Sequence, residues 1–355
     1  MAVTLSDVAR RAGVSAATAS RVLNGQRYVA SVTRARVEAA VRDLDYVPNR
    51  AARELSTART ATIALLVHHA QYPAHGEGTF SSRVVDGVSR ALRQSGFDLL
   101  YVPVDDAAVT RLAGLAAARS SRSDGVIVLG PAFPRAALES LVVTGRPAVT
   151  IDNRHRGLDA VLADNRPAMA ALTRHLVEDH GYRRLACIAG PARWPSTSER
   201  VAGIRTVARR AGATLRVLHA RETTMRDGAE LAGRVAEDQP EAIMAVNDAM
   251  AIGALHRLRR PGASWLPAVT GFDDIAWARL TDPPLTTVEV DVTAIGLEAA
   301  RLLMRRIGAS GSHRPPAREV RVPATVQRRQ SCGCRPERSA SPAMAAPSEE
   351  EDRYR

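Results

Sequence analysis

The sequence predicts an all-α helix-turn-helix head followed by an α/β core of two lobes, each built on a doubly wound parallel sheet. Within the first 60 residues, short amphipathic helical segments are separated by a break at Gly13. From Thr60 onward, apolar runs of strand length alternate with helical patterns, which is typical of βαβ units. About 270 residues exceed one compact doubly wound sheet, so we expect two lobes with a cleft between them.

The head is expected to contain three helices. The first is expected to start near Ser6, and Thr4 stands three residues before Asp7 in a variant of the capping box. Gly13 supplies the backbone freedom that the turn requires, and Ser15 caps the second helix, which runs to about Asn24. The second helix of such a motif enters the DNA major groove, so the pattern indicates double-stranded DNA as a partner.

The third helix starts at Ser31 or Thr33 and ends at the run 46–48, because proline cannot continue a helix. Its apolar stripe consists of Val37, Ala40, Val41 and Leu44. The next segment, 49–56, has the pattern of a helix of roughly two turns, which is marginal in free solution. We expect it to order only when DNA and a partner chain supply contacts.

The core alternates strand and helix candidates along its length. The strand candidates are Thr62–Val67, Leu99–Val102, Gly125–Leu129, Ala148–Ile151, Arg184–Ala189, Ala242–Val246 and Ala268–Gly271. The helical segments lie near 81–95, 106–120, 134–144, 166–180, 198–211, 226–237, 247–259 and 291–307.

These patterns divide the chain into a head at 1–48, a short helix and linker at 49–60, a core at 61–330 and a tail at 331–355. The tail is rich in Pro, Ser, Ala and Glu and lacks periodicity, so we expect disorder there. Within the core, the expected first lobe covers about 61–161 and 290–318, and the second covers about 162–289 and 319–330.

The composition favours a DNA-binding protein of the cytoplasm. The formal net charge is +12, and all 49 basic residues are Arg, an absence of Lys that codon bias explains best. Residues 1–60 hold ten Arg and five acidic residues, so positive charge is densest in the head, where it suits phosphate. Three Cys do not form a disulfide framework, and the sequence shows neither a signal-peptide pattern nor a membrane-spanning run.

Residues 3–330 resemble the lactose-repressor (LacI/GalR) family of bacterial transcription factors. The resemblance is carried, in the family's order and spacing, by Val3–Asn24, Tyr46–Asn49, Ile188–Pro191, Glu199–Gly203, Val246–Gly253, Gly271–Asp274 and Pro283–Val288. It implies a DNA-binding head, a hinge helix at 49–60, and a core like the periplasmic sugar-binding proteins. It also implies that the core forms a homodimer and binds a small effector, which we expect to be a carbohydrate.

The resemblance assigns DNA contacts to the second helix and to the hinge. Arg21 suits bidentate donation to a guanine edge, with a phosphate contact as the alternative. Ala16 and Ala17 would offer only methyl contacts to bases. In the hinge, Leu55 matches the family's leucine wedge between base pairs, whereas packing against its own protein is the alternative. The expected contacts are Thr4, Ser15, Ala16, Ala17, Thr18, Ser20, Arg21, Asn24, Tyr46, Asn49, Arg50, Ala52, Arg53 and Leu55.

We expect Asn24, Tyr46 and Asn49 to make backbone or packing contacts rather than to read bases. Arg50 and Arg53 would lie near phosphates.

Polar residues that follow the apolar runs are candidates for the effector cleft, because ligands bind outside the carboxyl ends of parallel strands. These residues are His68, His69, Asp152, Asn153, Asn247, Asp248, Asp273 and Asp274. The family match favours Arg200 and Asp273 most strongly. Trp194 is expected either to stack on a sugar face or to be a partly buried loop aromatic. The expected effector set is His69, Asp152, Trp194, Arg200, Asn247 and Asp273.

Several alternatives stay open at these positions. Asp274 and Asp248 are expected to cap helices rather than to touch a ligand. The segment 68–80 is longer than the family's usual loop, and Thr223 stands where some members have an aromatic residue. Both departures leave the effector's identity open.

Other chemistry is not expected. His68, His69 and His75 lack a completing set of metal ligands, and Cys332 with Cys334 is expected to be an inert pair rather than a redox switch. We expect no cofactor and no catalysis, because the nucleotide and hydrolase motifs are missing. An exported sugar-binding protein, or an enzyme with a DNA-binding head, is the alternative function.

Overall fold

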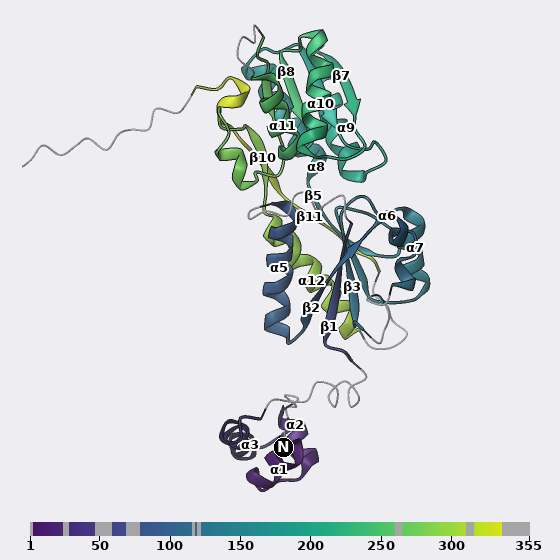
Figure 1. Cartoon of the computed structure of the whole chain (residues 1–355), viewed down its shortest axis with the longest axis vertical. Helices are drawn as coiled ribbons and strands as arrows, with labels where there is room; N and C mark the ends of the chain where they lie inside the picture. The colour runs from purple at the N-terminus through teal and green to yellow at the C-terminus, as the bar shows by residue number, and fades with distance from the viewer. Residues whose placement is uncertain are drawn as a thin grey trace, which may run out of the picture. The chain divides into compact units, whose positions relative to one another are not determined.

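The computed structural model describes residues 3–23, 28–46, 59–68, 79–115, 118, 122–259, 265–309 and 316–335. The chain forms two compact units, Met1–Ala61 and Thr62–Arg355. The first is helical and the second contains all of the described strands (Figure 1). Among the described residues, no helix is long and apolar enough to cross a membrane.

The head unit contains α1 (Leu5–Ala12), α2 (Ala16–Leu23) and α3 (Ser31–Asp43). The expected capping box is confirmed, because Thr4 accepts a hydrogen bond from the Asp7 backbone and the Asp7 side chain accepts one from the Thr4 backbone. Gly13 adopts φ 64°, the left-handed conformation that ends α1 and turns the chain toward α2. The three helices pack around a small core that includes Val8, Ala19 and Val37.

The first lobe of the core is built on a six-stranded parallel sheet of order β11-β5-β4-β3-β1-β2. Its strands are β1 (Thr62–His68), β2 (Asp98–Val104), β3 (Gly125–Leu129), β4 (Ala148–Ile151), β5 (Asp159–Ala163) and β11 (Glu319–Val322). Its helices are α5 (Phe80–Ser95), α6 (Asp106–Val109), η2 (Leu112–Gly114), α7 (Arg135–Val143) and α12 (Val292–Gly308).

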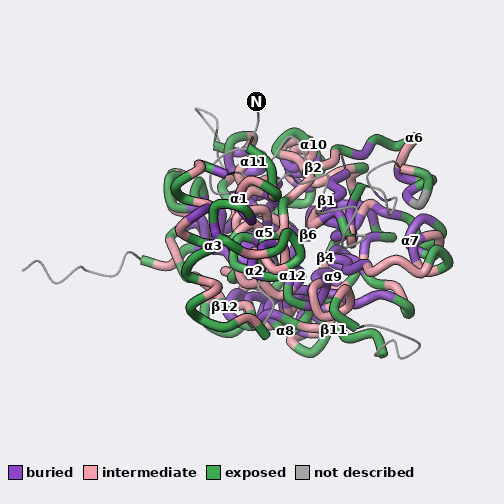
Figure 2. The backbone as a smooth tube through the Cα atoms, turned by 90° about the horizontal axis from the view of Figure 1, so that it is seen from below, coloured by how far each residue is buried: buried purple, intermediate pink, exposed green. Residues whose placement is uncertain are grey.

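Helices cover both faces of this sheet. In Figure 1, α5 and α12 lie on one face and α6 and α7 lie on the other. Strand β1 shows why, because it is apolar on both sides: Leu65 belongs to one buried cluster and Leu66 to another. A run without polar alternation is the mark of a strand covered on both faces. Six of the seven residues of β1 are buried, the class that is drawn in purple in Figure 2.

The second lobe is built on a four-stranded parallel sheet of order β7-β6-β8-β9 and a two-stranded antiparallel sheet of β10 and β12. The strands are β6 (Arg184–Ala189), β7 (Thr214–His219), β8 (Ala242–Ala245), β9 (Ala268–Thr270), β10 (Thr287–Val290) and β12 (Ala324–Gln327). The α-helices are α8 (Asn165–Arg174), α9 (Pro195–Arg210), α10 (Met225–Val235) and α11 (Asp248–Leu258). Shorter turns are the π-helix η4 (His175–Asp179) and the 3-10 helices η5 (Ala236–Asp238), η6 (Ala276–Arg279) and η7 (Gln330–Cys332).

The backbone passes between the lobes three times. The passages lie between β5 and α8, between β10 and α12, and between β11 and β12. Two expected lobe boundaries were therefore wrong. Residues 319–322 form β11 in the first sheet rather than part of the second lobe, and β5 extends the first lobe to Ala163. β11 is an edge strand of mixed polarity, which gave no strong strand pattern, whereas β5 lies inside the sheet between β11 and β4 and is buried along its whole length.

Two further expectations need correction. The helix expected at 106–120 ends at Val109 and is followed by the short turn η2. The tail expected from 331 begins too early, because Ser331 and Cys332 are buried in the second lobe. Residues 336–355 lie outside the described residues, as does the expected hinge segment from 49 to 58.

Candidate functional site

Helix α2 of the head buries one side and exposes the other. Ala19 and Val22 are buried in the head core, whereas Ala16, Ala17 and Arg21 are exposed. Half-buried positions on the same helix are Thr18 and Ser20. The exposed side is therefore a narrow surface of methyl groups with one guanidinium, which is the composition expected from the sequence.

Ser15 fixes the start of α2. Its Oγ accepts a hydrogen bond from the Thr18 backbone at 3.1 Å and shares another with Thr18 Oγ1 at 2.9 Å, so it is the expected cap. Thr4 is exposed and Tyr46 is 8% exposed within the head core. The structure therefore shows packing for Tyr46, which is one of the two alternatives that the sequence left open.

The other expected DNA contacts lie outside the described residues, and so does one expected effector contact, His69. The DNA contacts concerned are Asn24, Asn49, Arg50, Ala52, Arg53 and Leu55.

Five expected effector contacts line one cavity of about 490 Å³ in the core unit. They are Asp152, Trp194, Arg200, Asn247 and Asp273. Both lobes contribute: Asp152 follows β4 of the first lobe, whereas Arg200 lies on α9 of the second. Ser196 Oγ donates a hydrogen bond to Asp152 Oδ2 at 3.0 Å, which ties the lobes together at the cavity wall.

Arg200 is held rigidly at the floor of this cavity. Its Nε donates to Asn165 Oδ1 at 2.8 Å and its Nη1 donates to the Val246 carbonyl at 2.6 Å. The guanidinium also lies over the Phe272 ring, with its carbon 3.7 Å from the ring centre. Nη2 stands 3.5 Å from Asp273 Oδ1. A guanidinium fixed in this way keeps one donor edge toward the carboxylate and the cavity.

Asp273 and Asp152 are the two carboxylates of the cavity. Burial raises the pKa of Asp273 to about 6, and Asp152 adds to this while Arg200 opposes it. Burial likewise raises the pKa of Asp152 to about 6, against the attraction of Arg200. Both residues have a left-handed backbone, with φ 58° at Asp152 and φ 111° at Asp273. Such strain in a non-glycine residue is concentrated at functional sites.

Asp273 Oδ1 is a buried acceptor that has no hydrogen-bond donor among the residues that the structure describes. The ion pair with Arg200 at 3.5 Å lacks hydrogen-bond geometry. A buried carboxylate oxygen left in this state costs free energy until a donor reaches it. The cavity therefore favours a ligand that carries hydroxyl or amine donors.

Two of the chain's three tryptophans line this cavity. Trp194 is 5% exposed, and its Nε1 is buried without an acceptor among the described residues. Trp277, at the start of η6, is 53% exposed. Trp277 was not expected at the site from the sequence, although it lies four residues after Asp273. An exposed indole at the mouth of a polar cavity suits stacking on a sugar face.

The polar residues next to these aspartates serve the fold. Asn247 caps α11 by accepting from the Met250 backbone at 3.0 Å, and its amide donates to the Thr223 carbonyl at 3.0 Å. Asp248 does not cap that helix as expected, because its carboxylate accepts from the Ile275 backbone at 2.9 Å and from Thr287 at 2.5 Å. Asn247 therefore reaches the cavity with most of its hydrogen-bonding capacity used.

Asp274 does not cap a helix either. Its carboxylate pairs with Arg329 at 2.7 Å and with Arg279 at 3.2 Å. The residue before η6 is Ile275, so the expected capping role was wrong. Asn153 is also structural, since its amide donates to the Gly130 and Phe133 carbonyls.

Ion pairs join the lobes beside the cavity. Glu199, the neighbour of Arg200 on α9, pairs with Arg154 and, at 3.1 Å, with Arg321 of the first lobe. Arg83 on α5 donates to the Val290 carbonyl at 3.2 Å and to the Asp273 carbonyl at 3.5 Å. A first-lobe guanidinium is thus in contact with the backbone of a cavity carboxylate.

A larger hollow of about 1550 Å³ is also lined by Trp194. His68 lines this hollow instead of the smaller cavity, and its Nε2 stands 3.0 Å from Asp106. Charged residues around the hollow include Arg135, Arg154, Arg156, Arg193, Arg221 and Arg318. The 490 Å³ cavity has the size and enclosure of a small-molecule site, so we take it as the candidate effector site.

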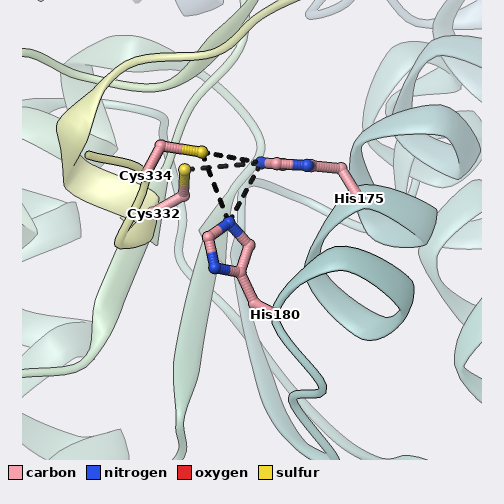
Figure 3. Close-up of side chains that lie close together, drawn as sticks. All are labelled: His175, His180, Cys332 and Cys334. Atoms are coloured by element: carbon pink, nitrogen blue, oxygen red, sulfur yellow. Dashed lines mark hydrogen bonds between the residues drawn. The ribbon is translucent and has the colours of Figure 1, made fainter. Parts of the chain in front are cut away.

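A separate cluster of metal-binding side chains lies in the second lobe. His175, His180, Cys332 and Cys334 come together there (Figure 3). From the sequence, the two cysteines were expected to be an inert pair, and the two histidines were not predicted as ligands. The signal was available as a His-x4-His spacing combined with the Cys-x-Cys spacing.

Comparisons with known proteins agree with this architecture. The family model described as "Bacterial regulatory proteins, lacI family" matches residues 4–49, and the one described as "Periplasmic binding protein-like domain" matches residues 173–332. The transcriptional regulator CelR of Thermobifida fusca is 34% identical over 332 residues, covering 89% of this chain and 95% of CelR. The ribose operon repressor of Escherichia coli K12 is 31% identical, covering 86% and 93%.

Solved structures show the same fold. A Lac repressor dimer bound to operator and the anti-inducer ONPF aligns with a TM-score of 0.74 at 25% identity, covering 94% of this chain and 99% of that one. A CelR–cellobiose complex aligns with a TM-score of 0.66 at 30% identity, covering 93% and 99%.

A helix-turn-helix head combined with a two-lobed binding core defines a DNA-binding transcriptional regulator. The chain belongs to the lacI family of bacterial regulatory proteins. The relatives named above are regulators of transcription rather than enzymes.

Proposed function

We propose that the chain is a homodimeric repressor that binds an operator and is controlled by a carbohydrate held in the 490 Å³ cavity. The observation that carries this proposal is the buried carboxylate of Asp273, which lies beside the fixed guanidinium of Arg200. Its Oδ1 has no hydrogen-bond donor among the described residues. Sugar hydroxyls donate to carboxylates and accept from guanidinium groups, so one polyol satisfies both residues.

The aromatic residues support the same ligand class. Trp277 stands exposed at the cavity, and Trp194 is buried in its wall. Indole faces pack against the C–H faces of a sugar ring while carboxylates bind its rim. The related CelR has been solved in complex with cellobiose, and another relative is the ribose operon repressor. We therefore propose a mono- or disaccharide as the effector.

For DNA, we propose that the exposed side of α2 enters the major groove. Ser15 and Thr4 would contact phosphates from their exposed capping positions, and Arg21 would donate to a guanine edge. Ala16 and Ala17 would leave little direct readout beyond methyl contacts. A two-fold dimer would present two such helices to a roughly palindromic operator.

The proposed hinge residues are tested separately. Leu55→Ala is expected to lower operator affinity by more than twofold if Leu55 inserts between base pairs, because the wedge stabilises the kinked duplex. An affinity within about twofold of wild type, in a gel-shift titration, would remove that role and leave packing as the alternative.

Control by the ligand follows from its position between the lobes. A sugar that contacts Asp152 and Arg200 together binds best in one relative arrangement of the two lobes. It shifts the population toward that arrangement by its difference in affinity for the two states. We further propose that the chain acts in the cytoplasm, where bacterial operators lie, and that it does not turn over the bound sugar.

The central experiment is isothermal titration with cellobiose, cellotriose, ribose and glucose, followed by an operator gel shift with each ligand that binds. We expect at least one sugar to bind wild type and to change operator affinity, with binding lost in Asp273→Asn. The matched control is Asp86→Asn, whose carboxylate pairs with Arg90 on the surface of α5. Recovery of unchanged sugar after incubation tests the absence of turnover. A ligand set in which no sugar binds would contradict the carbohydrate proposal.

A further inference from the structure

Four side chains from two distant segments meet at one point of the second lobe. His175 belongs to η4 and His180 follows it, whereas Cys332 ends η7 and Cys334 lies two residues later. Their nearest nitrogen and sulfur atoms all lie within 4.8 Å of one another. Figure 3 shows both imidazole rings and both thiols directed toward the same small volume.

Four of the six distances between these atoms match those of a tetrahedral zinc site, and the other two are no longer than 4.8 Å. Zn–N bonds of about 2.05 Å and Zn–S bonds of about 2.3 Å place tetrahedral ligands about 3.3 Å apart for N and N and about 3.6 Å for N and S. Here His175 Nε2 and His180 Nε2 are 3.3 Å apart. The N-to-S distances are 3.4 Å from His175 to Cys332, 3.6 Å from His175 to Cys334 and 3.4 Å from His180 to Cys334.

The surroundings of His175 orient it as a ligand. Its Nδ1 lies 2.8 Å from Asp179 Oδ2, and Arg328 pairs with the same carboxylate oxygen at 3.2 Å. A carboxylate on one ring nitrogen keeps the proton there and leaves the lone pair of Nε2 pointing at the cluster. This carboxylate–histidine arrangement is the usual outer support of a zinc-binding histidine.

The Cys-Gly-Cys segment is shaped to bring two sulfurs to one point. Gly333 has φ 96°, and a Cβ at this position would stand 2.8 Å from the Tyr182 hydroxyl. That hydroxyl donates to the Cys332 carbonyl at 3.1 Å, and the Tyr182 ring stacks on His180 with 5.3 Å between ring centres. Only glycine combines this backbone conformation with such close packing. The sequence thus fixes both cysteines and one histidine by the same contacts.

We propose that His175, His180, Cys332 and Cys334 bind one Zn²⁺ as a structural site. Two thiolates and two imidazoles complete a tetrahedron, so no position is left open for a substrate or a catalytic water. The metal would join η4 to the segment that follows β12. This role is independent of DNA binding and of the sugar cavity.

The direct test is metal content and cobalt spectroscopy on the purified full-length protein. After exposure to Zn²⁺ and removal of free metal, we expect close to one equivalent of zinc per chain by mass spectrometry of the element. Loading the metal-free protein with Co²⁺ should give the intense visible bands of a tetrahedral cobalt site and a near-ultraviolet thiolate band. Wild-type protein that binds less than a tenth of an equivalent of either ion would overturn the proposal.

Variants distinguish metal binding at the cluster from nonspecific metal binding elsewhere on the surface. His180→Ala and the double change Cys332→Ser with Cys334→Ser should lose the cobalt bands and at least 90% of the bound zinc. The controls are His256→Ala on the exposed side of α11 and Cys187→Ala in β6, which should keep both. If a variant does not fold, the wild-type stoichiometry and spectrum still decide the question. Equal metal uptake by the cluster variants and wild type would contradict the assignment.

Stability and thiol counts give a second, independent answer. Saturating Zn²⁺ should raise the melting temperature of metal-free wild type by at least about 4 °C and leave the cluster variants unchanged. Three reactive thiols per chain in the denatured, metal-free protein are expected. A count of one, with no zinc bound before or after reduction, would show a disulfide between Cys332 and Cys334 and would sink the proposal.

Discussion

Replacing the cavity aspartate Asp273 by asparagine should stabilise the ligand-free protein while removing sugar binding. Burial raises the pKa of Asp273 from 3.8 to about 6, so its ionised form is disfavoured in the folded state. For an acid with a raised pKa, stability is fully present below the unfolded pKa and is lost as the pH rises through the folded pKa. Asparagine resembles the protonated acid and does not suffer this loss.

The magnitude follows from the two pKa values of Asp273. With 3.8 unfolded and about 6 folded, ionisation lowers the free energy of unfolding by about 3 kcal/mol at pH 7 and by about half as much at pH 5. These values already include the attraction of Arg200, because that attraction lowers the pKa of Asp273. Asp273→Asn should therefore be more stable than wild type by up to about 3 kcal/mol at pH 7. Its advantage in the free energy of unfolding should shrink to about half of that value at pH 5.

The assay is equilibrium urea unfolding at both pH values, with the difference between wild type and variant taken from the midpoints. Subtracting the two proteins removes the titration of all other groups. Asp86→Asn is the matched control and should differ from wild type by less than about 0.5 kcal/mol at either pH. A destabilised Asp273→Asn at pH 7, or a difference that does not change with pH, would refute the reasoning.

Three other expectations concern the helices and the cavity mouth. Arg21→Ala should weaken operator binding by about 1–3 kcal/mol in a gel shift, whereas Arg93→Ala on α5 should not. Equal losses of operator affinity in the two variants would exclude a base contact by Arg21. Gly253→Ala should lower the melting temperature, because its Cβ would meet the Met225 carbonyl at 1.9 Å, whereas Gly308→Ala should leave it unchanged. An unchanged melting temperature for Gly253→Ala would show that α10 and α11 separate freely. Trp277→Ala should weaken sugar binding by about 0.5–1.5 kcal/mol in calorimetry, and unchanged affinity would exclude stacking.

The fold was predictable from the sequence where the hydrophobic pattern was strong. The central strands β3, β4 and β6 match their predicted bounds because they are covered on both faces and read as unbroken apolar runs. Two of the strands that were missed, β7 and β11, lie at sheet edges and consist mostly of exposed and half-buried residues. A short run of mixed polarity does not distinguish an edge strand from a loop.

The site was predictable where the family's motifs carried it. Arg200 and Asp273 were expected together and line one cavity. Trp277 was missed because an isolated aromatic in a loop has no pattern, and Asp274 was misassigned because its partner Arg329 is distant in sequence. The zinc ligands were missed for the same reason, since the two histidines and the two cysteines are brought together only by the fold.

The three passages of the backbone between the lobes restrict how the core can move. One connection would permit any rotation, and two would still allow the lobes to swivel about the line joining them. Three short connections, at 163–165, 290–292 and 322–324, leave opening and shutting like a book as the motion of lowest cost. Effector binding would therefore change mainly one quantity, the angle between the two lobes. A second subunit would respond to that angle alone.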